Sequence, residues 1–479
     1  MSSGAAAPEA PRAIAAERLV GDAPPSPAGP APGDDAAVHL PPALQLPRAL
    51  QTLRFSIRQI EFLFRARREL GEVFQLRGIV GDNVNVVTGH PDHVRSLFTA
   101  KPEEAPSLTG ESPLRPIVGP NSVLTAIGPR HMRQRKLLLP LFHGDAVQRY
   151  TEMIADAAGR EIDSWPVGTP FRLAPRMQAI TLDVIMSGIF GIEGDPARGT
   201  PEHGLRRAVR RVLDLSTRPE AQLAELLNLG RDEPVAMTRV VLGFLDRSLY
   251  AVISARRAAP DHDERRDILS ILLDAETEDG ERLTDKELRD ELLTLVLAGH
   301  ETTANSLAWT FERLLRHPAA YERLRDVARS DDDSDGYVEA TVHEGMRSRP
   351  VIPIIGRRVT VPWQLGEYRV PAETSVLMSI LLLHHRDDLY PDPFAFRPER
   401  FIGRKPGTYT WIPFGGGIRR CLGAALAMAE QRVVLREIAR RTDLHAPDPR
   451  PERARHRNVT MIPSAGARVV MSGRSGRTA

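Results

Sequence analysis

The chain has 479 residues, of which 42% are hydrophobic and 26% charged, so it has the composition of an ordinary globular protein with a sizeable core. Its 64 basic and 62 acidic residues leave a formal net charge of +2, which argues for neither a nucleic acid nor an anionic membrane as partner. The single cysteine excludes an internal disulfide framework and a cysteine-rich zinc site, and it favours a reducing, cytoplasmic setting. No basic and apolar leader is visible, and no run reaches the roughly 18 apolar residues of a membrane helix, so we expect neither a signal peptide nor a transmembrane segment.

The first part of the chain changes character near residue 40. Residues 1–40 are rich in alanine and proline, lack a hydrophobic period, and are predicted to form a disordered arm. The stretches GEVFQLRG and DNVNVVTGH then predict two short strands of one hairpin at about 71–89. From Pro129 to about Leu315 the hydrophobic pattern is mostly helical.

Strand patterns return in the last third of the chain. TVPWQLGEYRVPAETSVLMS has strand character, with turn residues at Gly366 and Pro371. RNVTMIPSAGARVVM predicts a last hairpin around Ser464–Gly466. The sequence therefore predicts a mainly α protein with small β-sheets built from distant segments. Because such segments must fold together, we expect one domain over 41–473 and a disordered tail at 474–479.

The stretch LTDKELRDELLTLVLAGHETTANSLAWTFERLLRHP predicts a long helix. Thr284 and Glu287 form the pattern of a capping box, and Pro318 is expected to stop the helix. At about 1.5 Å per residue the helix would span roughly 50 Å. One face carries the residues Leu288, Leu292, Leu295, Gly299, Thr302 and Ser306.

The middle of this helix is unusual. Gly299 lowers helix stability and suggests that another group approaches closely there. Thr302 can bond to a carbonyl one turn earlier and bend the helix, and Glu301 beside it can relay protons. The plain alternative is a long core helix with a tolerated polar patch, although buried carboxylates and hydroxyls are costly without partners.

EATVHEGMRSRP predicts a short helix on which Glu344 and Arg347 face each other at i, i+3. This spacing alone is typical of an exposed salt bridge. About fifty residues later, the prolines of YPDPFAFRPERF impose extended, turn-rich backbone, and Arg400 can join the pair. A buried carboxylate between two guanidiniums would hold that irregular segment in place.

The stretch FGGGIRRCLG holds the only cysteine, Cys421. Glycines at 415–417 allow positive φ angles and the close approach of a flat group. A helical pattern follows, so the thiol would lie at a helix N-terminus beside Arg419 and Arg420, and all of these features favour a thiolate. A buried structural cysteine and a nucleophile are the alternatives. A nucleophile needs a nearby base, and the nearest histidines in the sequence, His384 and His385, are distant. A ligand to a metal cofactor fits better.

Four stretches together resemble the cytochrome P450 family, the haem-thiolate monooxygenases. FGGGIRRCLG resembles its haem-binding signature, AGHETT its oxygen-activation helix, EGMR its Glu-x-x-Arg helix and FRPERF its meander. They occur in the order and spacing of the family, and the resemblance covers about 41–473. It implies the cytochrome P450 fold, with an α-rich part and a smaller β-rich part around a buried haem.

The resemblance also implies roles for single residues. Cys421 would be the axial thiolate ligand of the haem iron. Thr302 would steer protons to dioxygen, with Glu301 and ordered water behind it. Gly299 would leave room over the porphyrin. Further contacts with the cofactor would come from Phe414 beside the thiolate, from Gly415, Gly423 and Ala298, and, at the propionates, from His131, Arg135, Arg357 and Arg419. Arg358 is an alternative to its neighbour Arg357.

By the same resemblance, the protein would be a monomeric monooxygenase with haem b that hydroxylates or epoxidises a lipophilic small molecule. Electrons from NAD(P)H would arrive indirectly, through a ferredoxin and a ferredoxin reductase, and an acidic carrier could contact Arg404, Lys405 and Arg420, although these charges can equally be simply solvated. Pocket walls would come from 104–124, Leu295, Ala298, Ile354, Ile355, Met461 and Ile462.

Three other functions stay open at this point. They are a peroxide-using enzyme of the same fold, a haem sensor or carrier without catalysis, and a cysteine hydrolase without haem.

Overall fold

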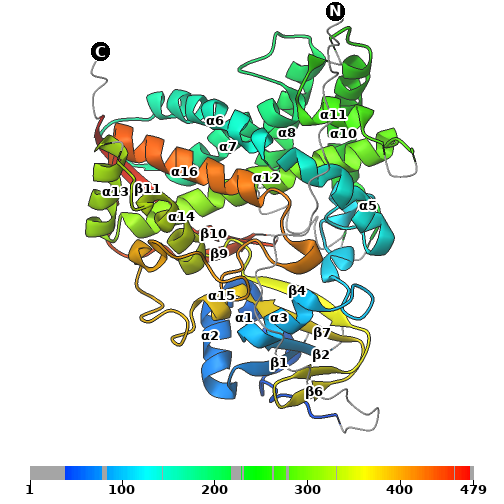
Figure 1. The fold of residues 1–479 in the computed structure, drawn as a ribbon, viewed down its shortest axis with the longest axis vertical. Coiled ribbons are helices and arrows are strands. Elements are labelled where there is room, and N and C mark those ends of the chain that lie inside the picture. The colour runs from blue at the N-terminus through cyan, green and yellow to red at the C-terminus, as the bar shows by residue number, and fades with distance from the viewer. Residues whose placement is uncertain are drawn as a thin grey trace, which may run out of the picture. The chain divides into compact units, whose positions relative to one another are not determined.

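The computed structural model describes residues 38–77, 84–142, 144–216, 228, 231–261, 264–276, 280–330, 332–457 and 459–474. The predicted N-terminal arm up to residue 37 and the tail from residue 475 onward lie outside these residues. The described residues from His39 onward belong to one compact unit. Most helices lie on one side of this unit, and the largest sheet lies on the other (Figure 1).

Helices make up most of the described chain, as the sequence predicts. None of those helices is both long and apolar enough to cross a membrane. The α-helices are α1 (Arg48–Ile57), α2 (Gln59–Leu70), α3 (Pro91–Thr99), α4 (Arg115–Val118), α5 (Gly128–Leu138), α6 (Asp145–Asp163), α7 (Leu173–Phe190), α8 (Pro201–Ser216), α10 (Ala236–Arg257), α11 (Ile268–Asp274), α12 (Asp285–Leu314), α13 (Pro318–Ser330), α14 (Tyr337–Ser348), α15 (Ile380–His384) and α16 (Ala424–Arg441).

The strands form small separate sheets. They are β1 (Val73–Arg77), β2 (Val84–Thr88), β3 (Phe171–Arg172), β4 (Ile354–Val359), β5 (Trp363–Leu365), β6 (Tyr368–Val370), β7 (Thr374–Ser379), β8 (Thr442–His445), β9 (Ala454–Arg457), β10 (Thr460–Pro463) and β11 (Arg468–Arg474). The four-stranded sheet has the order β1-β2-β7-β4. The predicted first hairpin is confirmed, because β1 and β2 pair antiparallel, and β7 joins β2 in parallel.

The four-stranded sheet has apolar side chains on both faces. On β2 and β7, Val86 and Val376 pack in one hydrophobic cluster, whereas Val87 and Leu377 pack in another. This alternation follows from the two-residue period of a strand. Because both faces are packed against other segments, the sheet is part of the hydrophobic core and supports the segments that lie against it.

The predicted last hairpin is wrong. β10 pairs with β9, which precedes it, and β11 pairs with β3 and β8 instead of β10. The turn at Pro463–Gly466 exists, with a backbone bond from Gly466 to Pro463. However, it joins two different sheets, because both strands find better partners from distant parts of the chain.

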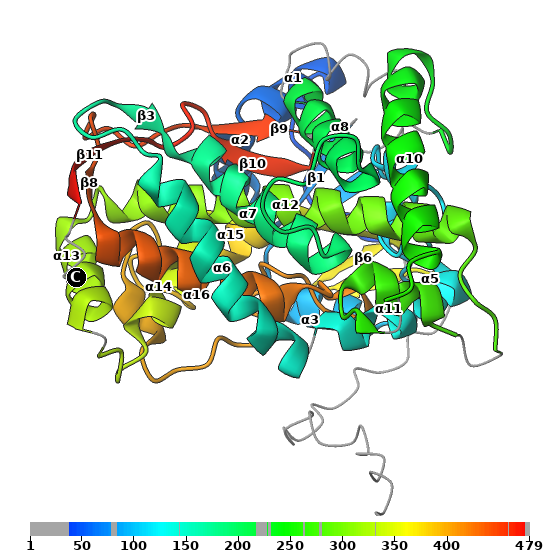
Figure 2. The same cartoon turned by 90° about the horizontal axis from the view of Figure 1, so that it is seen from above.

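Helix α12 is the central element of the helical part, and it runs past α6, α7 and α10 (Figure 2). The predicted capping box is present, with Thr284 and Glu287 bonding each other's backbone N–H groups. The helix ends at Leu314, and Pro318 is the first residue of α13 rather than the stop itself. Residues of α6, α7, α12 and α16 share the largest hydrophobic cluster, which fixes α16 against α12.

Candidate functional site

The cysteine loop, residues 414–423, directly precedes α16 in the chain. Two of its glycines adopt the positive φ angles that glycine allows. Gly415 and Gly417 have φ angles of +65° and +61°, as predicted. Gly416 is different, because its φ of −167° is open to any residue. A Cβ there would lie 2.2 Å from the ring of Phe98, so steric space explains this glycine. The Cys421 N–H donates to the Phe414 carbonyl at 2.9 Å, which closes the loop just before α16.

The Cys421 thiol has the predicted neighbours but not the predicted pKa. The Gly423 N–H, Arg135 and Arg420 all lower its pKa, yet burial raises it further, so the net shift is upward. The Cys421 side chain keeps accessible surface, although the surrounding protein atoms are close enough to raise its pKa. The expectation of a thiolate from the loop alone is therefore wrong, because removal of water outweighs the positive charges. A bound metal cation would reverse the balance.

Four basic side chains gather near this thiol. Burial and the mutual repulsion of the group lower the pKa of Arg419 to about 10 and that of His131 to about 3. Burial also lowers the pKa of Arg357 to about 10. Arg135 donates to the Arg420 carbonyl at 2.8 Å. Among the described residues, no carboxylate forms an ion pair with Arg135, Arg357 or Arg419. His131 and Arg357 are buried and Arg135 and Arg419 are half-buried, and a cationic cluster of this kind is a site for a ligand with more than one negative charge.

The structure also distinguishes Arg357 from its neighbour. Arg357 is 6% exposed and faces the cluster, whereas Arg358 pairs with Glu111 at 2.8 Å. The two lie on β4, where successive side chains point to opposite faces. Of the two candidates, the structure therefore brings Arg357 to the cationic cluster.

The middle of α12 is less buried than the rest of the helix, at the place where the sequence pattern changes. Ala298 is exposed, and Gly299, Glu301 and Thr302 are half-buried, although most of the helix on either side is buried. The Thr302 hydroxyl donates to the Ala298 carbonyl at 2.6 Å, as predicted. In this part of α12, the Thr302 and Glu301 side chains are therefore less deeply buried than most residues on either side.

Gly299 has a role that the sequence did not reveal. A Cβ at this position would lie 2.6 Å from Cδ1 of Ile185 on α7. The predicted close approach is therefore made by another helix, and the room that Gly299 would leave over a cofactor stays a prediction. Contact of the Gly299 backbone with a cofactor stays a prediction.

Glu301 has partners that sequence reasoning missed. Its Oε1 accepts from Nε of Arg457 at 2.7 Å, from Nη2 of the same residue, and from the Thr460 hydroxyl at 3.3 Å. Both partners lie at the β9–β10 turn, more than 150 positions along the chain. All three bonds go to one oxygen, so among the described residues the carboxylate is anchored at Oε1 and not at Oε2.

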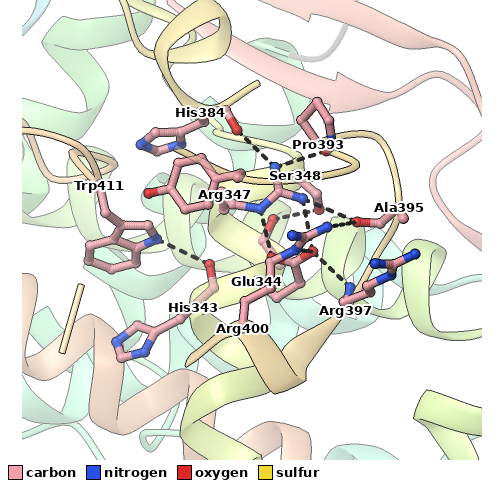
Figure 3. Close-up of polar contacts among 12 residues, drawn as sticks. His343, Glu344, Arg347, Ser348, His384, Pro393, Ala395, Arg397, Arg400 and Trp411 are labelled. Atoms are coloured by element: carbon pink, nitrogen blue, oxygen red, sulfur yellow. Dashed lines mark hydrogen bonds and ion pairs between the residues drawn. The ribbon is translucent and has the colours of Figure 1, made fainter. Parts of the chain in front are cut away.

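The predicted Glu344, Arg347 and Arg400 set is present and buried (Figure 3). Arg347 donates to both oxygens of Glu344, at 2.7 and 2.8 Å, and Arg400 lies 3.5 Å from Oε1. Arg347 also donates to the carbonyls of His384, Pro393 and Ala395, and the Arg397 N–H donates to Glu344 at 2.8 Å. The set therefore holds the irregular segment before the cysteine loop.

The remaining predicted residues lie on the elements expected of them. Ile354 and Ile355 are on β4, and Met461 and Ile462 are on β10, where Trp309 of α12 donates to the Met461 carbonyl at 2.9 Å. The side chains of Arg404, Lys405 and Arg420 are exposed.

The residues present fit a haem. Among the described residues, no three His, Cys, Asp or Glu side chains group as metal ligands, so a metal on Cys421 would need its other ligands from a non-protein group. A porphyrin supplies four such ligands, and its two propionates match the cationic cluster. Cys421, Arg135, Arg357, Arg419 and His131 would hold it.

Comparisons with known proteins agree with this site. The family model described as Cytochrome P450 matches residues 40–471. The chain is 38% identical over 441 residues to a Mycobacterium tuberculosis protein named cytochrome P450 135B1, which covers 90% of this chain and 91% of that protein. It is also 38% identical over 448 residues to a Mycobacterium bovis protein named cytochrome P450 138, and this alignment covers 93% of this chain and 99% of that protein.

Solved structures show the same fold. The retinoic acid-bound cyanobacterial CYP120A1 aligns with a TM-score of 0.74 at 22% identity, over 92% of this chain and 100% of that chain. The cytochrome P450DA heme domain aligns with the same TM-score of 0.74, over 91% of this chain and 98% of that chain. The predicted fold class is confirmed, and the chain belongs to the cytochrome P450 family, the haem-thiolate monooxygenases.

Proposed function

We propose that this cytochrome P450 hydroxylates or epoxidises a lipophilic small molecule, with haem b bound through Cys421 and with electrons from NAD(P)H delivered by a ferredoxin and its reductase. When bound, the haem supplies the activation of dioxygen by two electrons and two protons. The chain supplies the ligand, the proton path and the pocket.

The observation that carries the proposal is the cationic cluster beside the only thiol. Arg135, Arg357 and Arg419 repel one another and have no carboxylate partner among the described residues. A bound anion would offset this repulsion, and the two propionates of haem would provide it. The backbone at Gly415, Gly423 and Phe414 surrounds the thiol and would pack against the porphyrin.

Thr302 and Glu301 are the proposed proton donors. The Thr302 hydroxyl is half-buried on the open part of α12 and can pass a proton after releasing the Ala298 carbonyl. Arg457 anchors the Glu301 carboxyl group at Oε1, and next to Thr302 this group would exchange protons with ordered water.

The substrate class follows from the expected pocket walls. Leu295, Ile355 and Ile462 are apolar but only half-buried. Met461, the neighbour of Ile462 in the sequence, is buried. Apolar walls with few polar groups favour a lipophilic ligand. The exposed charges of Arg404, Lys405 and Arg420 support docking of an acidic ferredoxin.

The experiment is a reconstituted assay with purified protein, a ferredoxin, its reductase and NADPH. A lipophilic library is first screened for spin-shift spectra, and each hit is then tested for turnover. The proposal predicts NADPH consumption that depends on the hit and yields a product with one added oxygen atom from dioxygen. Binding spectra without any oxygenated product would favour a haem carrier, and equal turnover with peroxide and no reductase would favour a peroxide-using enzyme.

A further inference from the structure

The segment between α4 and α5 is held from two sides. It spans 119–126 and leads directly into α5, which carries His131 and Arg135 of the cationic cluster. A Cβ on Gly119 would lie 2.2 Å from the carboxyl group of Asp290, so the segment packs tightly on α12. Its position therefore depends on what α12 presents to it.

On one side, consecutive residues of α12 bind its backbone. Oε1 of Glu291 accepts from the Val123 N–H at 2.8 Å. Asp290 accepts from the N–H and the side-chain amide of Asn121, at 3.2 and 3.0 Å. The Thr294 hydroxyl lies 2.6 Å from that of Ser122. Three side chains within about one turn of α12 thus fix residues 121–123.

On the other side, the segment orients Arg419. Nη1 of Arg419 donates to the Val123 carbonyl at 3.2 Å and to the Leu124 carbonyl at 3.5 Å, and Nη2 donates to the Ala126 carbonyl at 2.5 Å. A guanidinium has five N–H donors, so donors remain for an anion after these three carbonyls are served. The plane of the guanidinium is set by where the carbonyls lie.

Of the three side chains on α12 that hold this segment, Glu291 has the highest free-energy cost of burial. It is 0% exposed, and its Oε2 has no hydrogen-bond partner among the described residues. Among the described residues, the Val123 N–H is the one donor to this carboxyl group. Burying a carboxyl group for a single bond is expensive, and no packing reason requires it.

We propose that Glu291 is a positioning residue for haem binding, which fixes the Val123 backbone so that the adjoining carbonyls orient Arg419 toward the haem propionates. The inference rests on the proposed role of Arg419 as a propionate ligand. It gives the N-terminal third of α12 and the cysteine loop a physical link through one stretch of backbone.

The test measures the rate of haem loss from the purified haem-loaded protein to excess apomyoglobin. Glu291→Leu removes the bond to Val123 and is expected to speed haem loss about tenfold, the effect of one buried hydrogen bond. Glu291→Gln keeps the acceptor oxygen and is expected to stay within about twofold of the natural protein. Thr294→Val, a milder change that removes the neighbouring contact with Ser122 of the same segment, is expected to speed haem loss about threefold and replaces Glu291→Leu if that variant does not fold.

Glu430→Leu is the matched control. Glu430 on α16 is also buried and has an oxygen without a partner among the described residues, but it does not bind the 119–126 segment. Its replacement is expected to leave the rate of haem loss within about twofold, since it removes the same chemical group from a different place.

A double-mutant cycle separates the inference from its foundation. Arg419→Leu alone is expected to speed haem loss at least about tenfold, and adding Glu291→Leu to it should then change little. If Glu291→Leu speeds haem loss equally in both backgrounds, the carboxyl group acts only on general stability and the inference is overturned. If Arg419→Leu has no effect, the proposed role of Arg419 fails, and the inference fails with it.

Discussion

Loss of the Glu344 charge gives the sharpest prediction for the fold around the cysteine loop. Glu344→Gln keeps the shape of the side chain but leaves the Arg347 guanidinium without a counter-charge. Both side chains are 0% exposed, so water cannot solvate the charge that remains. The same carboxylate holds Arg400 and the backbone of Arg397, so the segment before the cysteine loop loses its anchor as well.

The magnitude follows from burial. Removing one partner of a fully buried ion pair costs about 3–5 kcal/mol, because the other charge stays desolvated. The chain contains a matched control on α16, where Glu437 and Arg440 have the same i, i+3 spacing and a 2.7 Å contact, but the Arg440 side chain is 47% exposed. The Glu437 side chain is 14% exposed, but water reaches Arg440, so this partly exposed pair is expected to contribute about 1 kcal/mol, and Glu437→Gln should cost about that much.

The assay is urea unfolding of the haem-loaded protein, followed by circular dichroism and by the haem absorption band. Glu344→Gln should lower the unfolding midpoint clearly, and Glu437→Gln should move it much less. Equal effects of the two substitutions would contradict this prediction, because only the Glu344 pair is fully buried and also holds Arg400 and the Arg397 backbone.

Three further predictions concern α12 and α16. Thr302→Ala should raise peroxide release per NADPH consumed while Thr302→Ser restores coupling, and unchanged coupling in the alanine variant would leave Thr302 as a helix residue only. Gly299→Ala should destabilise the protein by about 1 kcal/mol in thermal unfolding through the contact with Ile185, and Ile185→Val should relieve it; no relief would point to a different neighbour. Burial raises the pKa of Glu430 to about 8, so the folded state binds this proton more tightly and stability falls as pH rises from about 4.5 through 8. Glu430→Gln should therefore stabilise the protein in urea at pH 9 by an amount on the order of 5 kcal/mol, but change little at pH 5, and equal effects at both pH values would contradict this assignment.

Features set by nearby residues were predictable from the sequence. The capping box at Thr284 and the first hairpin follow from local patterns, and the structure confirms both. The last hairpin failed because β9 and β8 lie earlier in the chain and compete for its strands. A local pattern indicates that a strand exists, but it does not name the partner when a distant segment packs better.

The site shows the same limit in its electrostatics. Charges and helix position around Cys421 are readable in the sequence, but the burial that raises its pKa depends on the whole fold. The Arg457 partner of Glu301 was missed for the same reason, since nothing near either residue links them. Alternation along a strand separates Arg357 from Arg358 only once the strand register is known.

Ligation of haem by Cys421 is the central claim, and one measurement tests it most directly. The reduced protein is treated with carbon monoxide, and the absorption band of the natural chain is compared with that of Cys421→His. Arg420→Ala, a change to the exposed neighbour in the same loop, is the control. The account predicts a red-shifted band in the natural chain and in Arg420→Ala, and its loss in Cys421→His with haem still bound. A red-shifted band that survives in Cys421→His would contradict the account.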